Sequence, residues 1–177
     1  MIIKILIAFA CIAVIVAIAV SIKLKTEAKE KMYLAAERVL QNRLLDNELK
    51  NPFLRGTVIE EPTGQQLMIQ FTARSDKHKQ NYVFSPSDPI SFGRDRAKNK
   101  IAVNEALVST EHCRIFLSQD GSPVLQDTSS NGTVIKRGFR SYAVANGQTC
   151  VIANGDKLRI GTAEFKIKLF YYDMTWL

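Results

Sequence analysis

The chain has 177 residues, of which 46% are hydrophobic, so it is long enough and apolar enough for one folded domain with additional segments. Its formal net charge is +7, but the 24 lysines and arginines are spread along the chain without a block of five or more. Scattered cations are typical of a solvated surface. The composition therefore excludes a wholly disordered chain and gives no support to nucleic acid as a partner.

The cysteines and histidines are too few and too far apart for a metal site. Three cysteines (Cys11, Cys113 and Cys150) form no Cys-x-x-Cys pair, and the two histidines are His78 and His112. We therefore predict no metal and no cofactor. The same spacing predicts free thiols in a reducing compartment rather than a disulfide framework.

The N-terminal segment is strongly apolar. Ile5 to Ile22 contains eighteen residues without a charge, and Met1 to Ile3 extend it to the roughly 20 residues that span a bilayer. Residues 1–23 are accordingly predicted to be a single-pass transmembrane anchor. Four lysines follow this segment: Lys23, Lys25, Lys29 and Lys31. Lysines after a span favour a cytoplasmic C-terminal side, so we predict a cell-membrane protein with its C-terminal domain in the cytoplasm.

A cleavable signal peptide is the alternative for this segment. Lys4 would be its charged start, and Ala17 to Ala19 would be its small-residue cleavage site. The apolar run continues past that site, which favours the uncleaved anchor. Whether the segment is cleaved stays open at this point.

Residues 24–63 are predicted to form a helical spacer and linker. From Thr26 to Lys50 the sequence is rich in Ala, Glu, Lys and Leu, with apolar residues near helical spacing, and Pro52 is predicted to end the helix. One interpretation is a solvated spacer that holds the domain away from the membrane. The other is a helix that pairs with a partner or with copies of itself.

Residues 64–177 show the pattern of an all-β domain. Short β-rich segments follow one another at intervals of roughly 8 to 12 residues, with turn residues between them, as in a β-sandwich. In the segment EFKIKLF, Phe165, Ile167 and Leu169 alternate with lysines, as expected for a half-buried strand. The polar loops at the ends of the sandwich are then the candidate site.

No sequence motif indicates catalysis. The chain has no GxSxG, P-loop, GxGxxG or HExxH pattern. Ser109 and His112 occur together as STEH, but a catalytic triad also needs an orienting acid and an oxyanion hole. We therefore predict that the protein is not an enzyme.

The stretch DTSSNGT, from Asp127 to Thr133, concentrates hydrogen-bonding groups between two hydrophobic runs. Asn131 and Gly132 alone are a common hairpin signal, since a type I′ turn needs positive φ at both positions. A turn does not need the hydroxyls around them. The stretch is therefore interpreted either as a hairpin turn or as a recognition surface.

Four motifs in this order resemble the forkhead-associated (FHA) domain. They are Gly93-Arg94, Ser109-x-x-His112, the DTSSNGT stretch, and NGDKLRIG from Asn154 to Gly161. The resemblance extends from about Gln66 to Tyr171. It implies an FHA-type β-sandwich of about eleven strands that binds phosphothreonine peptides through loops at one end.

The resemblance also implies roles for single residues. Arg94 and Ser109 would hold the phosphate, Asn131 would bond to the peptide backbone, and Ser130 would line the place of the threonine methyl group. The residues implied as structural support of the site are Gly93, His112, Gly132 and Thr133.

Two positions depart from the family pattern. Leu107 occupies a position where some members have a cation, two residues before the binding serine. Lys136-Arg137 stands where many members have Asn-Gly, which puts the usual turn after that strand in doubt.

The partners that the resemblance implies are a phosphothreonine-containing protein and a Ser/Thr kinase, with no small-molecule substrate. The function expected is a membrane-anchored adaptor downstream of such a kinase, and by analogy a role in bacterial envelope growth or division. Two alternatives stay open: a degenerate sandwich that acts as a structural scaffold without phospho-dependence, and an exported protein with a cleaved signal.

Overall fold

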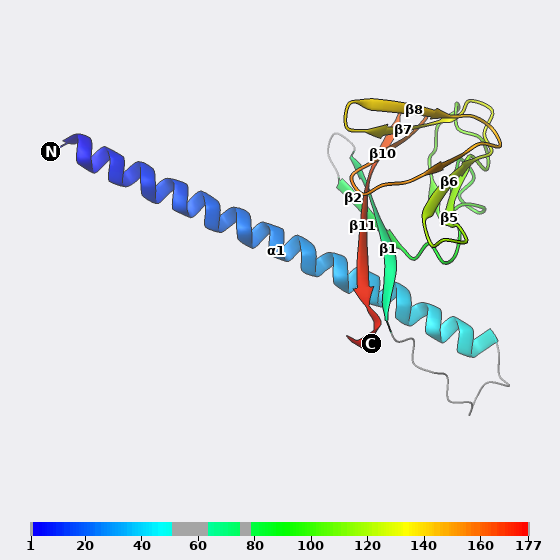
Figure 1. Cartoon of the computed structure of the whole chain (residues 1–177), viewed down its shortest axis with the longest axis horizontal. Helices are drawn as coiled ribbons and strands as arrows, with labels where there is room; N and C mark the ends of the chain where they lie inside the picture. Colours follow the sequence, from blue (N-terminus) through cyan, green and yellow to red (C-terminus); the bar gives the residue numbers. More distant parts are fainter. Residues whose placement is uncertain (1, 51–63, 75–78, 177) are drawn as a thin grey trace.

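The computed structural model describes residues 2–50, 64–74 and 79–176, with side chains at 2–10, 44–50, 74 and 176 outside the description. One long helix, α1 (Ile2–Lys50), precedes eleven strands (Figure 1). The strands are β1 (Gln65–Arg74), β2 (Lys79–Phe84), β3 (Ile90–Gly93), β4 (Ile101–Ala102), β5 (Cys113–Leu117), β6 (Pro123–Asp127), β7 (Thr133–Arg137), β8 (Arg140–Val144), β9 (Thr149–Val151), β10 (Lys157–Ile160) and β11 (Ala163–Asp173). A short 3-10 turn, Met174–Trp176, follows them.

The strands of the described chain form two sheets. The six-stranded sheet has the order β2-β1-β11-β10-β7-β8, and the five-stranded sheet has the order β4-β3-β5-β6-β9. Every pair that is formed is antiparallel apart from β3 and β4, which are parallel. The predicted β-sandwich of about eleven strands is thereby confirmed.

The main core lies between the two sheets. Ile69 and Phe71 of the six-stranded sheet and Ile90 and Phe92 of the five-stranded sheet are fully buried there. The rings of Phe71 and Phe92 meet edge-on with centroids 5.1 Å apart, an arrangement that aromatic pairs prefer. This packing gives the loops at the ends of the sandwich a rigid base.

Strand β11 shows why alternation in the sequence predicts this layering. Phe165 and Ile167 are buried, whereas Lys166 and Lys168 are exposed on the other face of the sheet. Successive side chains of a strand point to opposite faces, so the lysines lie on the outer face of the six-stranded sheet. The predicted half-buried strand is confirmed.

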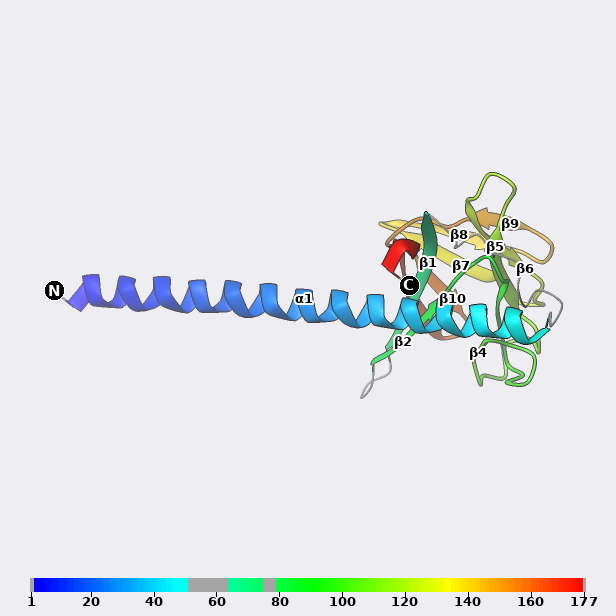
Figure 2. The same ribbon diagram turned by 90° about the horizontal axis from the view of Figure 1, so that it is seen from below.

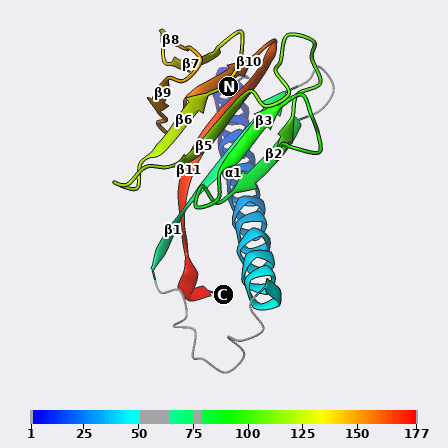
Figure 3. The same ribbon diagram turned by 90° about the vertical axis from the view of Figure 1, so that its right-hand side faces the viewer.

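Helix α1 packs on that outer face. Met32, Ala36 and Leu40 occupy one side of the helix and are buried in a second cluster with residues of β1, β2 and β11: Met68, Val83, Phe170 and Tyr172. Arg43 reinforces the contact through an ion pair with Asp88 at 2.8 Å. Figure 3 shows the helix beside these strands.

The predicted helix from Thr26 lies within α1, but it is not a fully solvated spacer. Its exposed part is the N-terminal part, because every described side chain from residue 11 to 31 is exposed. Figure 2 shows this part of the helix extending well beyond the sandwich. The predicted end of the helix at Pro52 and the linker up to residue 63 lie outside the described residues.

The membrane prediction requires correction. No helix in the part of the chain that the structure describes is long and apolar enough to cross a membrane. The predicted anchor and the predicted cell-membrane localisation are therefore wrong on this finding. Side chains 5–10 of the predicted span lie outside the description.

Candidate functional site

Three loops meet at one end of the sandwich and carry the predicted binding residues. The backbone N–H of Arg94, after β3, donates to the carbonyl of Ser109, which lies in the loop before β5, at 2.9 Å. The N–H of Ser130, in the loop after β6, donates to the Ser109 hydroxyl at 3.2 Å. The Asn131 amide donates to the Leu107 carbonyl at 2.8 Å. The structure therefore brings Arg94, Ser109, Ser130 and Asn131 together.

The Arg94 side chain is exposed at this end of the sandwich. Within the described residues it forms no ion pair and no side-chain hydrogen bond. A guanidinium presents its donors as a planar fork that matches phosphate or carboxylate oxygens. Since no described acidic side chain uses this fork, it is available to an external anion.

Gly93 is required by close packing rather than by an unusual backbone angle. A Cβ at this position would collide with the Thr110 carbonyl oxygen and with the side chain of Asn99. Asn99 uses its amide to join the two loops, donating to the carbonyls of Asp95 at 2.8 Å and Thr110 at 2.7 Å. Any larger residue at position 93 would therefore move the loop that carries Arg94.

His112 connects two of the three loops from a buried position. Its Nδ1 accepts the N–H of Ser109 at 3.2 Å, and its Nε2 lies 3.3 Å from the carbonyl oxygen of Gly132. Because Nδ1 accepts, the neutral ring carries its proton on Nε2 and donates it to that carbonyl. The carbonyl of His112 also accepts the N–H of Thr128 at 2.9 Å. One imidazole thus fixes the position of Ser109 relative to the DTSSNGT loop.

The protonation of His112 gives a pH prediction. Burial lowers the pKa of His112 below its usual 6.5, and the nearby Asp127 carboxylate and the Gly132 carbonyl oppose this only in part. This ring therefore binds a proton more readily in the unfolded chain than in the folded one. The contribution of neutral His112 to the free energy of unfolding is fully present above pH 6.5 and decreases as the pH falls below it. We expect the free energy of unfolding in urea to decrease between pH 7 and pH 5.

An NMR titration of the His112 ring in the folded protein tests the cause directly. A pKa at or above 6.5 would contradict the prediction. Following the ring itself also distinguishes the protonation of His112 from that of carboxylates, which begin to protonate at the low end of this pH range.

The DTSSNGT loop is organised around a buried carboxylate. Asp127 is inaccessible to solvent and accepts the backbone N–H of Ser129 at 2.8 Å and its hydroxyl at 2.9 Å. The Thr133 hydroxyl donates to the other carboxylate oxygen. The Ser129 hydroxyl accepts the N–H of Gly132 at 2.8 Å. The inward hydroxyls therefore satisfy Asp127, while Ser130 and Asn131 are exposed.

The hairpin interpretation of Asn131-Gly132 is wrong. Strand β6 belongs to the five-stranded sheet and β7 to the six-stranded sheet, so the loop between them crosses from one sheet to the other. Gly132 has φ of 76°, but no described residue other than glycine has positive φ, so Asn131 does not form a type I′ turn. A Cβ on Gly132 would lie 3.1 Å from the Val144 carbonyl oxygen, which is a second reason for glycine there.

The two departures from the family pattern have different outcomes. The doubted turn is present two residues later, at Gly138 and Phe139, since β7 and β8 pair up to Arg137 and Arg140 and Gly138 has positive φ of 57°. Arg137 instead forms two hydrogen bonds of 2.8 Å with the buried carboxylate of Asp156. Leu107 is exposed, and its carbonyl holds Asn131. That Leu107, in place of a cation, weakens phosphate binding stays a prediction.

Sequence reasoning missed three residues that shape the site. Asp127, Ser129 and Asn99 are buried polar side chains whose partners are distant loops or the adjoining turn. Asp127 and Ser129 were visible as members of the DTSSNGT pattern, which was the available signal. Asn99 lies in a polar loop where its sequence neighbours do not distinguish it from a surface residue.

The thiols agree with the prediction of free cysteines. All three cysteines lie in the described part of the chain and none forms a disulfide. No group of three or more histidine, cysteine or acidic side chains in the described residues has metal-binding geometry.

Together, the two sheets form a β-sandwich that carries the predicted site residues on polar loops at one end. Residues 90–161 match the family model of the FHA domain, and this part of the chain is an FHA domain. FHA domains are phosphothreonine-binding modules of signalling proteins and are generally not enzymes. The match contains every predicted site residue.

Curated relatives match over the same region. The chain is similar to the E3 ubiquitin-protein ligase CHFR of Xenopus tropicalis, with 38% identity over 71 residues, which is 40% of this chain and 11% of the relative. The human CHFR protein is 37% identical over 67 residues, covering 37% of this chain and 10% of the relative. The chain thus spans about a tenth of these proteins.

The chain is also similar to solved structures. The N-terminal FHA domain of Rad53p from S. cerevisiae, solved in complex with a phosphothreonine peptide, has a TM-score of 0.48 and 19% identity, covering 58% of this chain and 94% of that one. The FHA domain of an Arabidopsis thaliana hypothetical protein has a TM-score of 0.46 and 27% identity, covering 59% of this chain and 85% of that one.

Proposed function

We propose that the protein is a phosphothreonine-peptide-binding adaptor and that the loop cluster described above is its binding site. The observation that carries the proposal is the Arg94 guanidinium, which has no partner among the described residues while the backbone at Arg94 is bonded to that of Ser109. A phosphothreonine carries nearly two negative charges and three acceptor oxygens near neutral pH. The guanidinium fork of Arg94 and the Ser109 hydroxyl supply complementary donors.

Asn131 is assigned to the peptide backbone. Its amide uses one N–H on the Leu107 carbonyl, which leaves its second N–H and its carbonyl oxygen for a ligand. A side chain with one donor and one acceptor can bond to both groups of an extended backbone. Gly93, His112, Gly132 and Thr133 support this arrangement through the contacts described above and do not touch the ligand.

Upstream of such an adaptor we place a Ser/Thr kinase, because the ligand must be made by phosphoryl transfer to threonine. The ligase activity of CHFR is not assigned to this chain, which covers about a tenth of that protein. The part in bacterial envelope growth or division stays a prediction from the resemblance, since no residue of the described site bears on it.

Binding of three matched peptides tests the proposal. In the full chain, a phosphothreonine peptide selected from an oriented library should bind with micromolar affinity, about −7 to −9 kcal/mol, whereas its unphosphorylated form should not bind measurably. The full chain is required because α1 covers Met68 and Phe170, which a shorter fragment would expose. Equal binding of the unphosphorylated peptide would favour the scaffold alternative.

The phosphoserine form of the same peptide should bind more weakly than the phosphothreonine form. One buried methyl group contributes about 0.8 kcal/mol, which corresponds to about fourfold in affinity. Calorimetry on the matched pair measures this difference. Equal affinities would mean that Ser130 and Asn131 do not enclose the threonine methyl group.

A further inference from the structure

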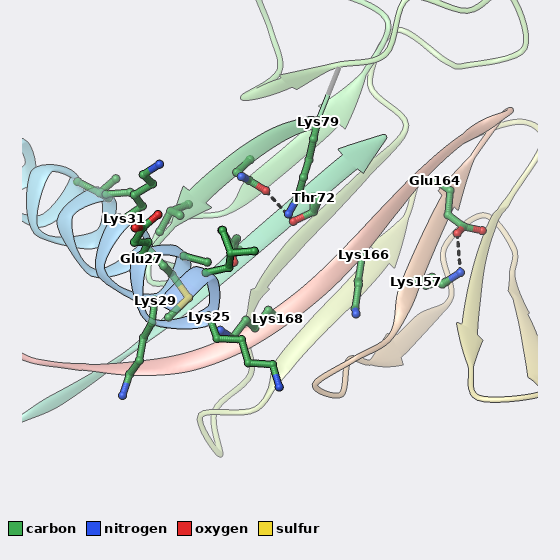
Figure 4. A pocket seen from close by; sticks show the side chains of 18 residues that line it. Lys25, Glu27, Lys29, Lys31, Thr72, Lys79, Lys157, Glu164, Lys166 and Lys168 are labelled. Atoms are coloured by element: carbon green, nitrogen blue, oxygen red, sulfur yellow. Dashed lines mark hydrogen bonds and ion pairs between the residues drawn. The ribbon is translucent and has the colours of Figure 1, made fainter. Parts of the chain in front are cut away.

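A second polar surface lies between helix α1 and the outer face of the six-stranded sheet, which is the face turned away from the main core. Between Leu24 and Val39, the helix and the outer sheet face enclose a groove of about 1340 Å³ (Figure 4). Its sheet side is formed by the outer faces of β1, β2, β10 and β11. None of the predicted phosphopeptide-binding residues lines this groove.

The groove is strongly basic. Seven lysines line it against two glutamates, Glu27 and Glu164, so that its net formal charge is +5. The lysines come from both walls, as Figure 4 shows: Lys25, Lys29 and Lys31 from the helix, and Lys79, Lys157, Lys166 and Lys168 from the sheet.

The carboxylate of Glu164 is already occupied. It forms ion pairs with Lys157 at 2.9 Å and with Lys136 at 3.1 Å. These two lysines hold the pKa of Glu164 below its usual range. Lys166 and Lys168, two residues apart on β11, form no ion pair within the described residues. Their charges therefore face the groove without internal compensation.

The sheet retains like charges directly opposite each other. Lys157 on β10 faces Lys166 on β11, and on its other side it faces Lys136 on β7. Like charges opposite each other on antiparallel strands destabilise a sheet. A bound anion would remove this repulsion, and such local conflicts in a sequence are expected at functional sites.

We propose that this groove binds an acidic segment of a partner protein, rich in Asp and Glu. The charge of the groove requires an anionic ligand, and an extended acidic chain presents many separate carboxylates to the flexible, separate ammonium groups that line it. The proposal does not depend on phosphothreonine binding, because the two sites share no residue.

Two other occupants fit the lining less well. Among the described residues that line the groove, none is an aromatic side chain on which a base could stack and none is an arginine. A second copy of the chain is disfavoured because the chain itself carries a net charge of +7.

The test uses the full chain, a fluorescent oligoglutamate peptide and an oligoglutamine peptide of equal length. Oligoglutamate should bind and oligoglutamine should not, and binding should weaken as salt is raised. The double variant Lys166→Gln/Lys168→Gln should lower the affinity for oligoglutamate by about tenfold or more, since it removes the two uncompensated charges of β11. The matched control, Arg114→Gln/Arg140→Gln, removes two exposed strand cations outside the groove and should change the affinity by less than about twofold.

Two further readouts separate this proposal from general effects. The unfolding midpoint of the lysine variant should be unchanged or higher, because the repulsion between Lys157 and Lys166 is removed. The lysine variant should also retain the affinity of the protein for the phosphothreonine peptide, and Arg94→Ala should retain the affinity for oligoglutamate.

Equal binding of oligoglutamate by the lysine variant and the unsubstituted chain would overturn the proposal. A lower unfolding midpoint of the variant would contradict the cross-strand repulsion on which it rests. Tighter binding of single-stranded DNA or of phosphatidylserine vesicles at equal charge concentration would assign the groove to another class of partner and overturn it as well.

Discussion

Replacing Arg94 by alanine is expected to remove most of the affinity for a phosphothreonine peptide. Each charge-assisted hydrogen bond to the phosphate contributes about 1.5 to 3 kcal/mol, so loss of the fork should weaken binding by about 10- to 100-fold. The fold should be unaffected, because the exposed side chain of Arg94 makes no described contact and its backbone hydrogen bond to Ser109 is independent of the side chain. Isothermal titration calorimetry measures the change in affinity.

Two further variants make this result specific. Arg94→Lys keeps the charge but loses the fork, so its affinity should lie between those of the unsubstituted protein and Arg94→Ala. Arg140→Ala removes one exposed cation on β8 and should leave the affinity within about twofold. If Arg94→Ala also stayed within about twofold while folded, the phosphate would have to bind elsewhere.

The largest effect on stability is expected from Asp127→Ala. The carboxylate receives the N–H and hydroxyl of Ser129 and the hydroxyl of Thr133, all in a buried position. Each buried donor left without a partner costs about 1 to 3 kcal/mol, so the free energy of unfolding should fall by about 3 to 5 kcal/mol. Urea unfolding followed by tryptophan fluorescence or circular dichroism measures it.

Asp120 provides a matched control for this variant. Its carboxylate also accepts two hydroxyls and one backbone N–H, from Ser118 and Ser122, but it is exposed. Water can replace it as the acceptor, so Asp120→Ala should cost less than about 1 kcal/mol. Equal losses in the two variants would show that burial does not decide the contribution of the Asp127 network.

The sequence could predict the strands and the candidate site because their signals are local. Alternation in β11 and the motifs that contain Arg94, Ser109 and Asn131 can each be read within a few residues. Which strands share a sheet is decided by contacts between distant segments. The Asn131-Gly132 signal therefore predicted a hairpin, although its flanking strands belong to different sheets.

The docking of the helix could be predicted only in part. Ala36 and Leu40 lie four residues apart, which indicates a helix with one apolar side, but nothing local identifies the surface that this side covers. Met68 stands between Leu67 and Ile69, and Val83 between Tyr82 and Phe84, so both faces of these strands are apolar there and either could have faced the main core. The contact depends on which face of the six-stranded sheet lies away from the second sheet, and that is a property of the whole fold.

The pairing of β1 with β11 has a consequence for biosynthesis. The two strands are interior neighbours in the six-stranded sheet, and Gln65 lies opposite Asp173 in their register. A ribosome delivers β1 long before β11, so in the interval β1 can pair with β2 alone and its edge toward β11 stays unpaired. Sheets that depend on such distant pairings fold slowly, in about milliseconds to seconds. We therefore expect the domain to fold only after β11 has left the ribosome, and a nascent chain arrested before Ala163 should be digested rapidly by protease.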